Sequence, residues 1–310
     1  MIKPVRTVYS INLREAALMR NPIFKGAATA IITPFKTDGV DFDKLAELLE
    51  FQIKEGIDAI VICGTTGEAS TMPDEEHVAT VKFTVDKVNK RVPVIAGAGS
   101  NDTRHAVELS KKLEAIGADA LLSVAPYYNK TTQRGLVAHF NECAKAVKLP
   151  FLVYNVPTRT NLNIAPDTLG ELSKTGNIVG IKECNLDQVA DVILRCEKDF
   201  AIYAGDDGIV LPLMAWGGLG VISVLSNIIP KDVHNICAKF FTGDLEGARK
   251  LALDTFGLFR ALFCEVSPIP VKEAMNQMGM AVGPCRLPLV PISEGGKKTV
   301  KDALAAYGLI

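Results

Sequence analysis

A lysine ends an apolar stretch of the sequence, at a place where an unpaired charge is unfavourable. In IVGIKE (178–183), Lys182 follows four residues that predict a buried strand. Removing a lone ammonium group from water disfavours its charged form and lowers the lysine pKa. Because a neutral amine attacks carbonyl groups, Schiff-base formation is the chemistry that this lysine favours. The alternative is a lysine that extends its charged end into solvent.

Other polar residues end the neighbouring apolar stretches. The hydroxyl of Tyr154 can donate and accept the protons that move as a carbinolamine becomes an imine. Thr65 and Tyr128 can extend this relay, and the GTTG turn (64–67) offers amides and hydroxyls to a carboxylate. Arg159 offers a planar guanidinium to a second carboxylate. Taken singly, these residues also fit a strand aromatic, an ordinary turn and a surface salt bridge, but their convergence favours catalysis.

These side chains need elements that bring them to one place. From about residue 27 the sequence alternates eight times between a short apolar stretch and an amphipathic, helix-like segment. Stretches that are apolar on both faces are typical of parallel strands covered by helices. Eight units of this kind predict an α/β fold, a (β/α)₈ TIM barrel, whose active site lies at the carboxyl ends of the strands. A doubly wound sheet is the alternative, but GAGSND (97–102) lacks the third glycine of a dinucleotide fingerprint.

The expected organisation has three parts. Residues 1–23 form an N-terminal extension that has several basic residues but only Glu15 as an acid, and that could mimic an organelle transit peptide. Residues 24–243 form the catalytic barrel, and residues 244–310, whose pattern is purely helical, form a C-terminal helical appendage. The uncharged stretch 209–230 is long enough to span a membrane, but its prolines and glycines favour a buried helix followed by a buried strand.

Composition and charge limit the class of partner. The 310 residues, 48% hydrophobic and 22% charged, have the composition of a soluble globular protein. A net charge of −1 provides no attraction for nucleic acid or an anionic membrane, so we expect small-molecule partners. Seven cysteines without a CxxC pair indicate reduced thiols and a cytoplasmic location. The four histidines are scattered, with His77 and His139 in predicted helices, and indicate packing or surface residues rather than a metal site.

Six motifs are specific in combination: GTTGEAS (64–70), PYYN (126–129), YNVPTRT (154–160), GIKE (180–183), GDD (205–207) and SPIPVK (267–272). Through them the chain, over residues 24–310, resembles the dihydrodipicolinate synthase (4-hydroxy-tetrahydrodipicolinate synthase) family. This family groups with N-acetylneuraminate lyase among the pyruvate-dependent class I aldolases. The resemblance implies a lyase that condenses pyruvate with L-aspartate 4-semialdehyde in the diaminopimelate and lysine pathway. It implies no cofactor beyond the covalent Schiff base with pyruvate.

The resemblance also implies roles for the residues of a proton relay. Lys182 would form the Schiff base with pyruvate, and Tyr154 would be the acid and base. Tyr154 would be linked through Thr65 to Tyr128 of the partner subunit. A shared site of this kind requires a dimer, and the family is commonly a homotetramer, a dimer of tight dimers.

A second group of residues would bind the substrates. By resemblance, Thr66 would bind the carboxylate of pyruvate, and Arg159 would hold the carboxylate end of aspartate semialdehyde at the entrance of the site. Gly205 and Ile222 would contribute backbone groups near the bound intermediate.

Two features depart from the family pattern. Asn161 follows YNVPTRT where the family usually has glycine, and the loop KECNLD (182–187) is shorter than the usual KEATGN type. Both departures concern the side of the second substrate.

Feedback by L-lysine is a further property of some members. The effector binds at the tight-dimer interface, at positions that correspond here to Ala69, Ser70, Asp74, His77, Asn101, His105 and Tyr127. Sensitive bacterial members have a glutamate where this chain has His105, and an imidazole cannot supply that negative charge. Asp74, at a position where histidine is common, could compensate in part. We therefore expect weak or no inhibition by lysine.

Two other functions are compatible with the same barrel. A sibling aldolase would act on a sugar acid, such as N-acetylneuraminate or 2-keto-3-deoxy-gluconate. Arg159 and the paired threonines favour the synthase, because a sugar-acid pocket needs partners for hydroxyl groups more than a second cation. A non-catalytic barrel that only binds a keto acid would not need the lysine, tyrosine and threonine of a proton relay.

Overall fold

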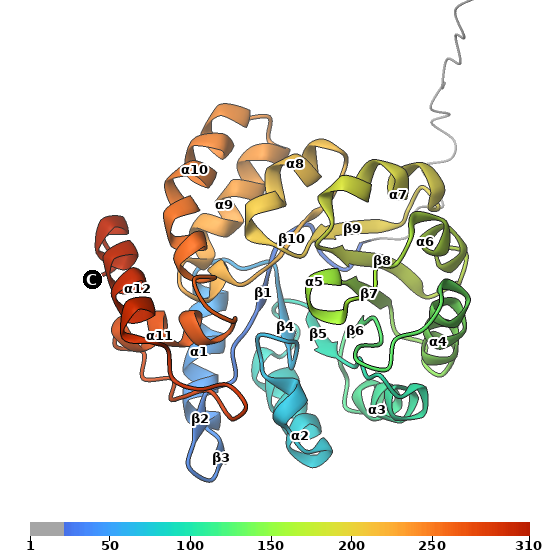
Figure 1. Cartoon of the computed structure of the whole chain (residues 1–310), viewed down its shortest axis with the longest axis horizontal. Helices are drawn as coiled ribbons and strands as arrows, with labels where there is room; N and C mark the ends of the chain where they lie inside the picture. The colour runs from blue at the N-terminus through green and yellow to red at the C-terminus, as the bar shows by residue number, and fades with distance from the viewer. Residues whose placement is uncertain (1–21) are drawn as a thin grey trace, which may run out of the picture.

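Eight parallel strands close into a barrel (Figure 1), in the order β1-β10-β9-β8-β7-β6-β5-β4. The computed structural model describes residues 22–310, so the expected N-terminal extension lies, except for its last two residues, outside the described residues. The barrel strands are β1 (Gly26–Ala30), β4 (Ala59–Ile62), β5 (Val94–Gly97), β6 (Ala120–Val124), β7 (Phe151–Asn155), β8 (Ile178–Glu183), β9 (Ala201–Ala204) and β10 (Gly220–Ser223). Each lies in a predicted apolar stretch, so the predicted TIM barrel is confirmed. A small antiparallel hairpin, β2 (Phe35–Lys36) and β3 (Gly39–Val40), follows β1.

Helices surround the barrel and connect its strands (Figure 1). They are α1 (Phe42–Lys54), α2 (Asp74–Val88), α3 (Thr103–Ala115), α4 (Gln133–Lys145), α5 (Pro157–Thr160), α6 (Pro166–Leu172), α7 (Val189–Arg195), α8 (Val210–Ala215), α9 (Pro230–Phe241), α10 (Leu245–Ala261), α11 (Ile269–Gln277) and α12 (Glu294–Tyr307). Short 3₁₀ helices are η2 (Ala69–Thr71), η3 (Leu186–Gln188), η4 (Asp207–Ile209) and η5 (Leu225–Asn227). The amphipathic segments of the sequence thus form helices that cover the barrel.

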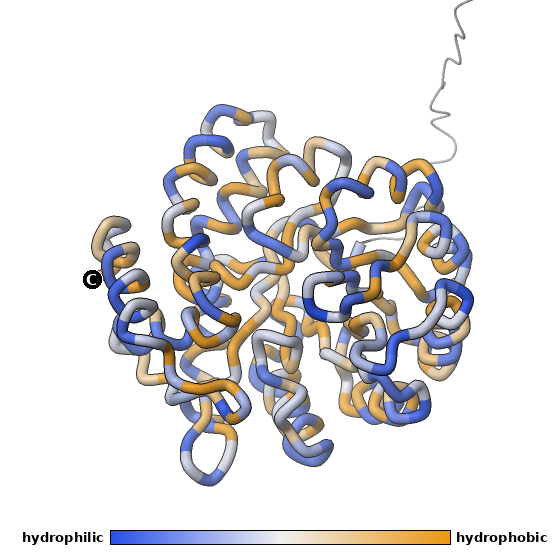
Figure 2. The backbone as a smooth tube through the Cα atoms, viewed as in Figure 1, coloured by the Kyte–Doolittle hydropathy of each residue, from blue (hydrophilic) through white to orange (hydrophobic). Residues whose placement is uncertain are grey.

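Both faces of the strands are buried, which explains their continuous apolar character. Because side chains alternate along a strand, Val61 and Leu122 pack inside the barrel, whereas Ile60 and Ile62 pack outward against the helices. Figure 2 shows apolar segments along the strands and polar segments on the outer turns of the helices. The pleat therefore decides which strand residues reach the interior.

The C-terminal helices extend one side of the barrel. Helix α10 packs against α9, and α12 packs against α10 and α11 (Figure 1). The uncharged stretch 209–230 forms α8 and β10, as predicted. Within residues 22–310, no helix is long and apolar enough to cross a membrane.

Candidate active site

Lys182 and Tyr154 face each other across two neighbouring strands at the end of the barrel. They are direct partners in the register of β7 and β8, so the pleat turns both side chains toward the interior. The amine Nζ of Lys182 lies 4.5 Å from the centre of the Tyr154 ring. Lys182 is 5% exposed and Tyr154 7% exposed. The structure thus brings the predicted nucleophile and the predicted proton donor together.

Burial shifts the pKa values of both groups in the direction that this chemistry needs. Desolvation lowers the pKa of Lys182, and the neighbouring Cys184 and Asp207 oppose that shift more weakly. Desolvation also holds the pKa of Tyr154 well above its ordinary value, so the phenol keeps its proton at neutral pH. A free amine beside a protonated hydroxyl can attack a carbonyl and protonate the oxygen that leaves.

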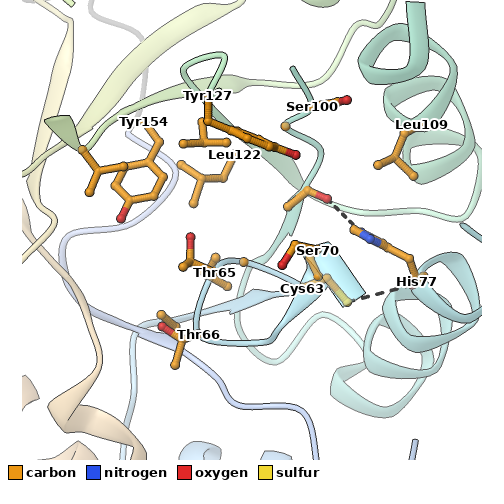
Figure 3. A pocket seen from close by; sticks show the side chains of 18 of the residues that line it. Cys63, Thr65, Thr66, Ser70, His77, Ser100, Leu109, Leu122, Tyr127 and Tyr154 are labelled. Atoms are coloured by element: carbon orange, nitrogen blue, oxygen red, sulfur yellow. Dashed lines mark hydrogen bonds between the residues drawn. The ribbon is translucent and has the colours of Figure 1, made fainter. Parts of the chain in front are cut away.

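A cavity of about 450 Å³ extends from this pair along the mouth of the barrel. Thr65, Thr66 and Arg159 line it together with Tyr154 and Lys182. In Figure 3 the Thr65 side chain points toward the Tyr154 hydroxyl, and Thr66 lies beside Thr65 at the cavity wall. The cavity is therefore lined by the hydroxyl groups of Thr65, Thr66 and Tyr154 together with Lys182.

The turn that holds both threonines is pressed against the rim of the barrel. It closes through a hydrogen bond from Glu68 N to Thr65 O, and the hydroxyl of Thr33 donates to Gly67 O at 2.7 Å. A Cβ at Gly67 would lie 3.2 Å from Ile31 O, so this position has little room for a side chain. The glycine of GTTGE thus allows the close approach that places Thr65 and Thr66.

Arg159 connects this cavity to a second one. It lines both, and the second, of about 600 Å³, is bordered by Cys184, Gly205, Asp206 and, in the C-terminal region, by Phe263 and residues 265–267. Arg159 is exposed, and its Nη2 donates to Ser267 O at 3.0 Å. The remaining donors of the guanidinium are available to an anion at the entrance.

Asn161, where the family usually has glycine, ends the short helix α5 that carries Arg159. Its backbone has φ +51° and ψ +32°, the left-handed conformation that glycine adopts most easily. Asparagine is among the side chains that tolerate this conformation, so the departure leaves the turn intact.

Gly205 also allows a close approach. A Cβ there would lie 2.4 Å from Cys184 Sγ and 3.1 Å from Lys182 Cγ, so any side chain would clash with the cysteine and crowd the lysine. Ile222, by contrast, is buried inside the barrel on β10 and lines neither of the two cavities. Of this predicted pair, only Gly205 directly borders a cavity.

Tyr128 lies away from the cavity of its own chain. It is 91% exposed, and Tyr127 lines the cavity instead. The contribution of Tyr128 to the site of a partner subunit therefore stays a prediction.

Sequence patterns did not assign a role to Cys184, Asp206 or Glu183, although all three follow or end strands. Cys184 and Asp206 line the second cavity.

Glu183 points away from Lys182 on the same strand, and it accepts hydrogen bonds from Asn155 Nδ2 and Gln188 Nε2 at 2.8 Å. Burial raises the pKa of Glu183 to about 7. This network fixes the short loop after Lys182. The polar residues at the strand ends were the sequence signal that could have identified Cys184, Asp206 and Glu183.

The two histidines expected to serve packing are buried. His77 Nε2 lies 2.9 Å from Gly97 O, and His77 also lines the far end of the first cavity. His139 Nδ1 lies 2.9 Å from the Thr103 hydroxyl. In the part of the chain that the structure describes, no group of three or more potential ligands is placed to hold a metal ion.

A closed (β/α)₈ barrel with a buried lysine beside a tyrosine at its mouth has the features of a class I aldolase-type lyase. The model of the dihydrodipicolinate synthetase family matches residues 23–307, and the chain belongs to this family. The predicted family is therefore confirmed.

Similar proteins agree on the activity. The chain is 62% identical to the 4-hydroxy-tetrahydrodipicolinate synthase of Acetivibrio thermocellus, over 94% of this chain and 100% of that protein. It is 56% identical to the synthase of Thermoanaerobacter pseudethanolicus, over 93% and 98%. Among solved structures, dihydrodipicolinate synthase from Aquifex aeolicus has a TM-score of 0.90 at 42% identity, over 92% of this chain and 99% of that chain. The predicted lyase activity, that of a 4-hydroxy-tetrahydrodipicolinate synthase, is thus confirmed.

Proposed function

We propose that this chain condenses pyruvate, bound as a Schiff base to Lys182, with L-aspartate 4-semialdehyde. The observation that carries the proposal is the buried amine of Lys182 beside the Tyr154 hydroxyl in a cavity at the barrel mouth. No cofactor takes part, because the lysine itself supplies the covalent link. A cytoplasmic location belongs to the same proposal, supported by seven cysteines that are all free.

The first half of the reaction forms the nucleophile. The Lys182 amine attacks the ketone carbon of pyruvate, and the carbinolamine hydroxyl leaves as water with a proton from Tyr154. The methyl group of the resulting imine then loses a proton and gives an enamine. Thr66, which is buried and lines the cavity, holds the pyruvate carboxylate in this proposal, while Thr65 exchanges protons with Tyr154.

The second half uses the other cavity. The enamine carbon attacks the aldehyde carbon of the semialdehyde, whose carboxylate binds Arg159, and the aldehyde oxygen gains a proton. The amino group of the semialdehyde then attacks the imine carbon and displaces Lys182, which closes the ring. Asp206 and Cys184 border the space where this substrate would lie.

Turnover measurements test the proposal directly. We expect pyruvate and L-aspartate 4-semialdehyde to be consumed together, and N-acetylneuraminate and 2-keto-3-deoxy-gluconate not to be cleaved. Cleavage of either sugar acid at a comparable kcat/KM would favour the sibling aldolase instead. Binding of pyruvate without turnover of any second substrate would favour a non-catalytic barrel.

The role of Arg159 predicts a selective defect. We expect Arg159→Ala to lower kcat/KM for the semialdehyde about ten- to a hundredfold, because a charged hydrogen bond contributes about 1.5–3 kcal/mol. Borohydride trapping of pyruvate on Lys182 should stay close to that of the wild type. Arg159→Lys should fall between the two, since lysine keeps the charge but not the planar fork. A trapping defect as large as the turnover defect would make Arg159 a structural residue.

A homotetramer built from tight dimers is part of the proposal, with Tyr128 reaching the site of the partner subunit. We expect Tyr128→Phe and Lys182→Ala to be inactive alone, and to recover activity when their subunits exchange. Random exchange should restore about a quarter of the wild-type activity, because half of the dimers are mixed and each has one complete site. Each variant taken alone through the same exchange is the control. Absence of recovery after proven exchange would place the relay within one chain.

The charges around Asp74 bear on feedback by lysine. Asp74 Oδ1 lies 2.9 Å from His105 Nε2, and Asp74 Oδ2 lies 3.3 Å from Lys112 Nζ. The hydrogen bond with His105, followed by that with Lys112, lowers the pKa of Asp74. Both oxygens of the one carboxylate that could replace the missing glutamate therefore already have basic partners in the same chain.

We accordingly expect weak or no inhibition by L-lysine. Loss of a charge-assisted contact of about 1.5–3 kcal/mol weakens binding about ten- to a hundredfold. A lysine titration of the initial rate at subsaturating pyruvate measures the effect. His105→Glu, which restores a carboxylate and releases Asp74, should increase sensitivity. Strong inhibition of the wild type well below millimolar lysine would contradict the prediction.

A further inference from the structure

A charged pair is buried between the C-terminal region and the turn that carries the threonines. Lys272, on α11, places its Nζ 2.6 Å from Glu68 Oε1, and the two side chains are 2% and 1% exposed. The same Nζ donates to Pro284 O at 2.9 Å and lies 4.4 Å from the centre of the Phe35 ring. Burial lowers the pKa of Lys272, and Glu68 opposes this shift. Buried ion pairs are often no more stable than apolar residues of similar size, so the role we assign to this pair is a positional one.

Glu68 is the last residue of the GTTGE turn. Its backbone has φ +56° and ψ +33°, and its amide closes the turn on Thr65 O. While Oε1 meets Lys272, Oε2 accepts a hydrogen bond from Arg286 N at 2.8 Å. Both oxygens of this carboxylate are therefore held by residues of the C-terminal region.

The C-terminal segment around Arg286 is in turn held by helix α2. The guanidinium of Arg286 forms a two-point ion pair with Glu76 on α2, with Nη2 2.7 Å from Oε1, and it lies 3.9 Å from the centre of the Phe35 ring. Lys272 and Arg286 thus both contact the same aromatic ring. Movement of residues 284–286 would carry the Glu68 carboxylate, and with it the turn.

We propose that Lys272 and Glu68 are positioning residues, which hold Thr65 and Thr66 in place at the mouth of the barrel. None of the residues that line the first cavity belongs to the C-terminal region, and the Lys272–Glu68 pair connects that region directly to the turn that carries Thr65 and Thr66. The proposal extends the proposed function, because it assigns the pyruvate half of the reaction to the turn that the pair fixes. A displaced turn impairs pyruvate binding and proton transfer, and leaves Arg159 and the second substrate largely unaffected.

Two variants separate positioning from simple stability. Lys272→Met keeps the length of the side chain but leaves Glu68 buried without a cation, so it should lower Tm. In the double variant Lys272→Met/Glu68→Gln no unpaired charge is buried, so Tm should recover. We expect both proteins to show a KM for pyruvate at least tenfold above that of the wild type, and a KM for the semialdehyde within twofold. Lys298→Met, an exposed lysine of α12 paired with Asp302, is the matched control and should change nothing.

Hydrogen exchange of the peptide that covers residues 60–72 provides a readout that needs no substrate. Faster exchange in the double variant than in the wild type, at equal Tm, is the expected result. A double variant with a normal Tm, wild-type exchange and wild-type pyruvate KM would overturn the proposal, as would equal rises in both KM values. Failure of the wild type to turn over the two substrates would instead refute the proposed function. The hydrogen-exchange result would still show whether Lys272 and Glu68 hold the turn in place.

Discussion

Lys182→Met should abolish both the pyruvate adduct and turnover. The variant keeps the apolar stem of the side chain in its buried place and removes only the amine. Because the covalent intermediate cannot form without it, we expect kcat to fall about 10⁴-fold or more. Incubation with pyruvate, reduction with borohydride and mapping of the modified peptide by mass spectrometry give the direct measurement. An adduct on another lysine, or wild-type trapping in the variant, would refute this mechanism.

The surroundings of Lys182 differ from those of two other lysines, Lys272 and Lys298. Lys272 is equally buried, but its amine is engaged by Glu68 and Pro284 O. Lys298 is exposed on α12, where its amine pairs with Asp302 and lies outside the cavity lining. Lys298→Met should therefore retain full trapping and full turnover, which makes it the control for the loss of a lysine as such.

The pH dependence of trapping follows from the same burial. Desolvation lowers the pKa of Lys182, so the free amine that attacks pyruvate is populated at a lower pH than for an exposed lysine. The trapping rate should rise with pH as the ammonium loses its proton, and level off below the ordinary lysine pKa. A rise that continues to the ordinary pKa would show that Lys182 is solvated in the free enzyme.

The sequence was sufficient to predict the barrel and the centre of the site. Continuous apolar stretches fit parallel strands with both faces covered, here by helices outside and by the barrel core inside, and a lysine at such a strand end lies at the barrel mouth. Lys182 and Tyr154 end adjacent strands, so their meeting follows from the topology alone. Thr65 and Thr66 lie in a turn after β4, and Arg159 lies in the short helix α5 after β7, so all three reach the same mouth.

What could not be predicted depends on contacts between distant parts of the chain. The hairpin β2–β3 and the helix α5 are too short to show a period in the sequence. The burial of Lys272 depends on Glu68, which lies far away in the sequence, and the SPIPVK motif gives no sign of it. Similarly, two adjacent tyrosines in PYYN differ only in backbone conformation, and Tyr128, with φ +66°, turns away from the cavity that Tyr127 lines.

Tyr154→Phe should leave Lys182 able to form the pyruvate adduct but remove the proton transfer from the Tyr154 hydroxyl. The ring that packs over the Lys182 amine remains, so the shape of the cavity is preserved. Removal of the hydroxyl takes away the group that protonates the departing carbinolamine oxygen, and positioned acids and bases contribute about 10²–10⁴-fold to rate. We expect kcat to fall by about that factor, and borohydride trapping to become slow but to reach the same final amount at Lys182. Timed quenching with borohydride after mixing with pyruvate measures both the rate and the final amount.

Tyr203→Phe is the matched control for this change. Tyr203 is also buried inside the barrel, on β9, which is separated from β7 by β8, but its hydroxyl donates to Phe24 O at 2.7 Å, and Tyr203 lines neither cavity. Its loss should lower the free energy of unfolding by about 1 kcal/mol, the contribution of a typical hydrogen bond, and leave the trapping rate unchanged. If Tyr154→Phe loses stability to the same extent but traps pyruvate at the wild-type rate, Tyr154 is a packing residue and the proton reaches the carbinolamine from another donor, such as Thr65, whose side chain points toward the Tyr154 hydroxyl (Figure 3).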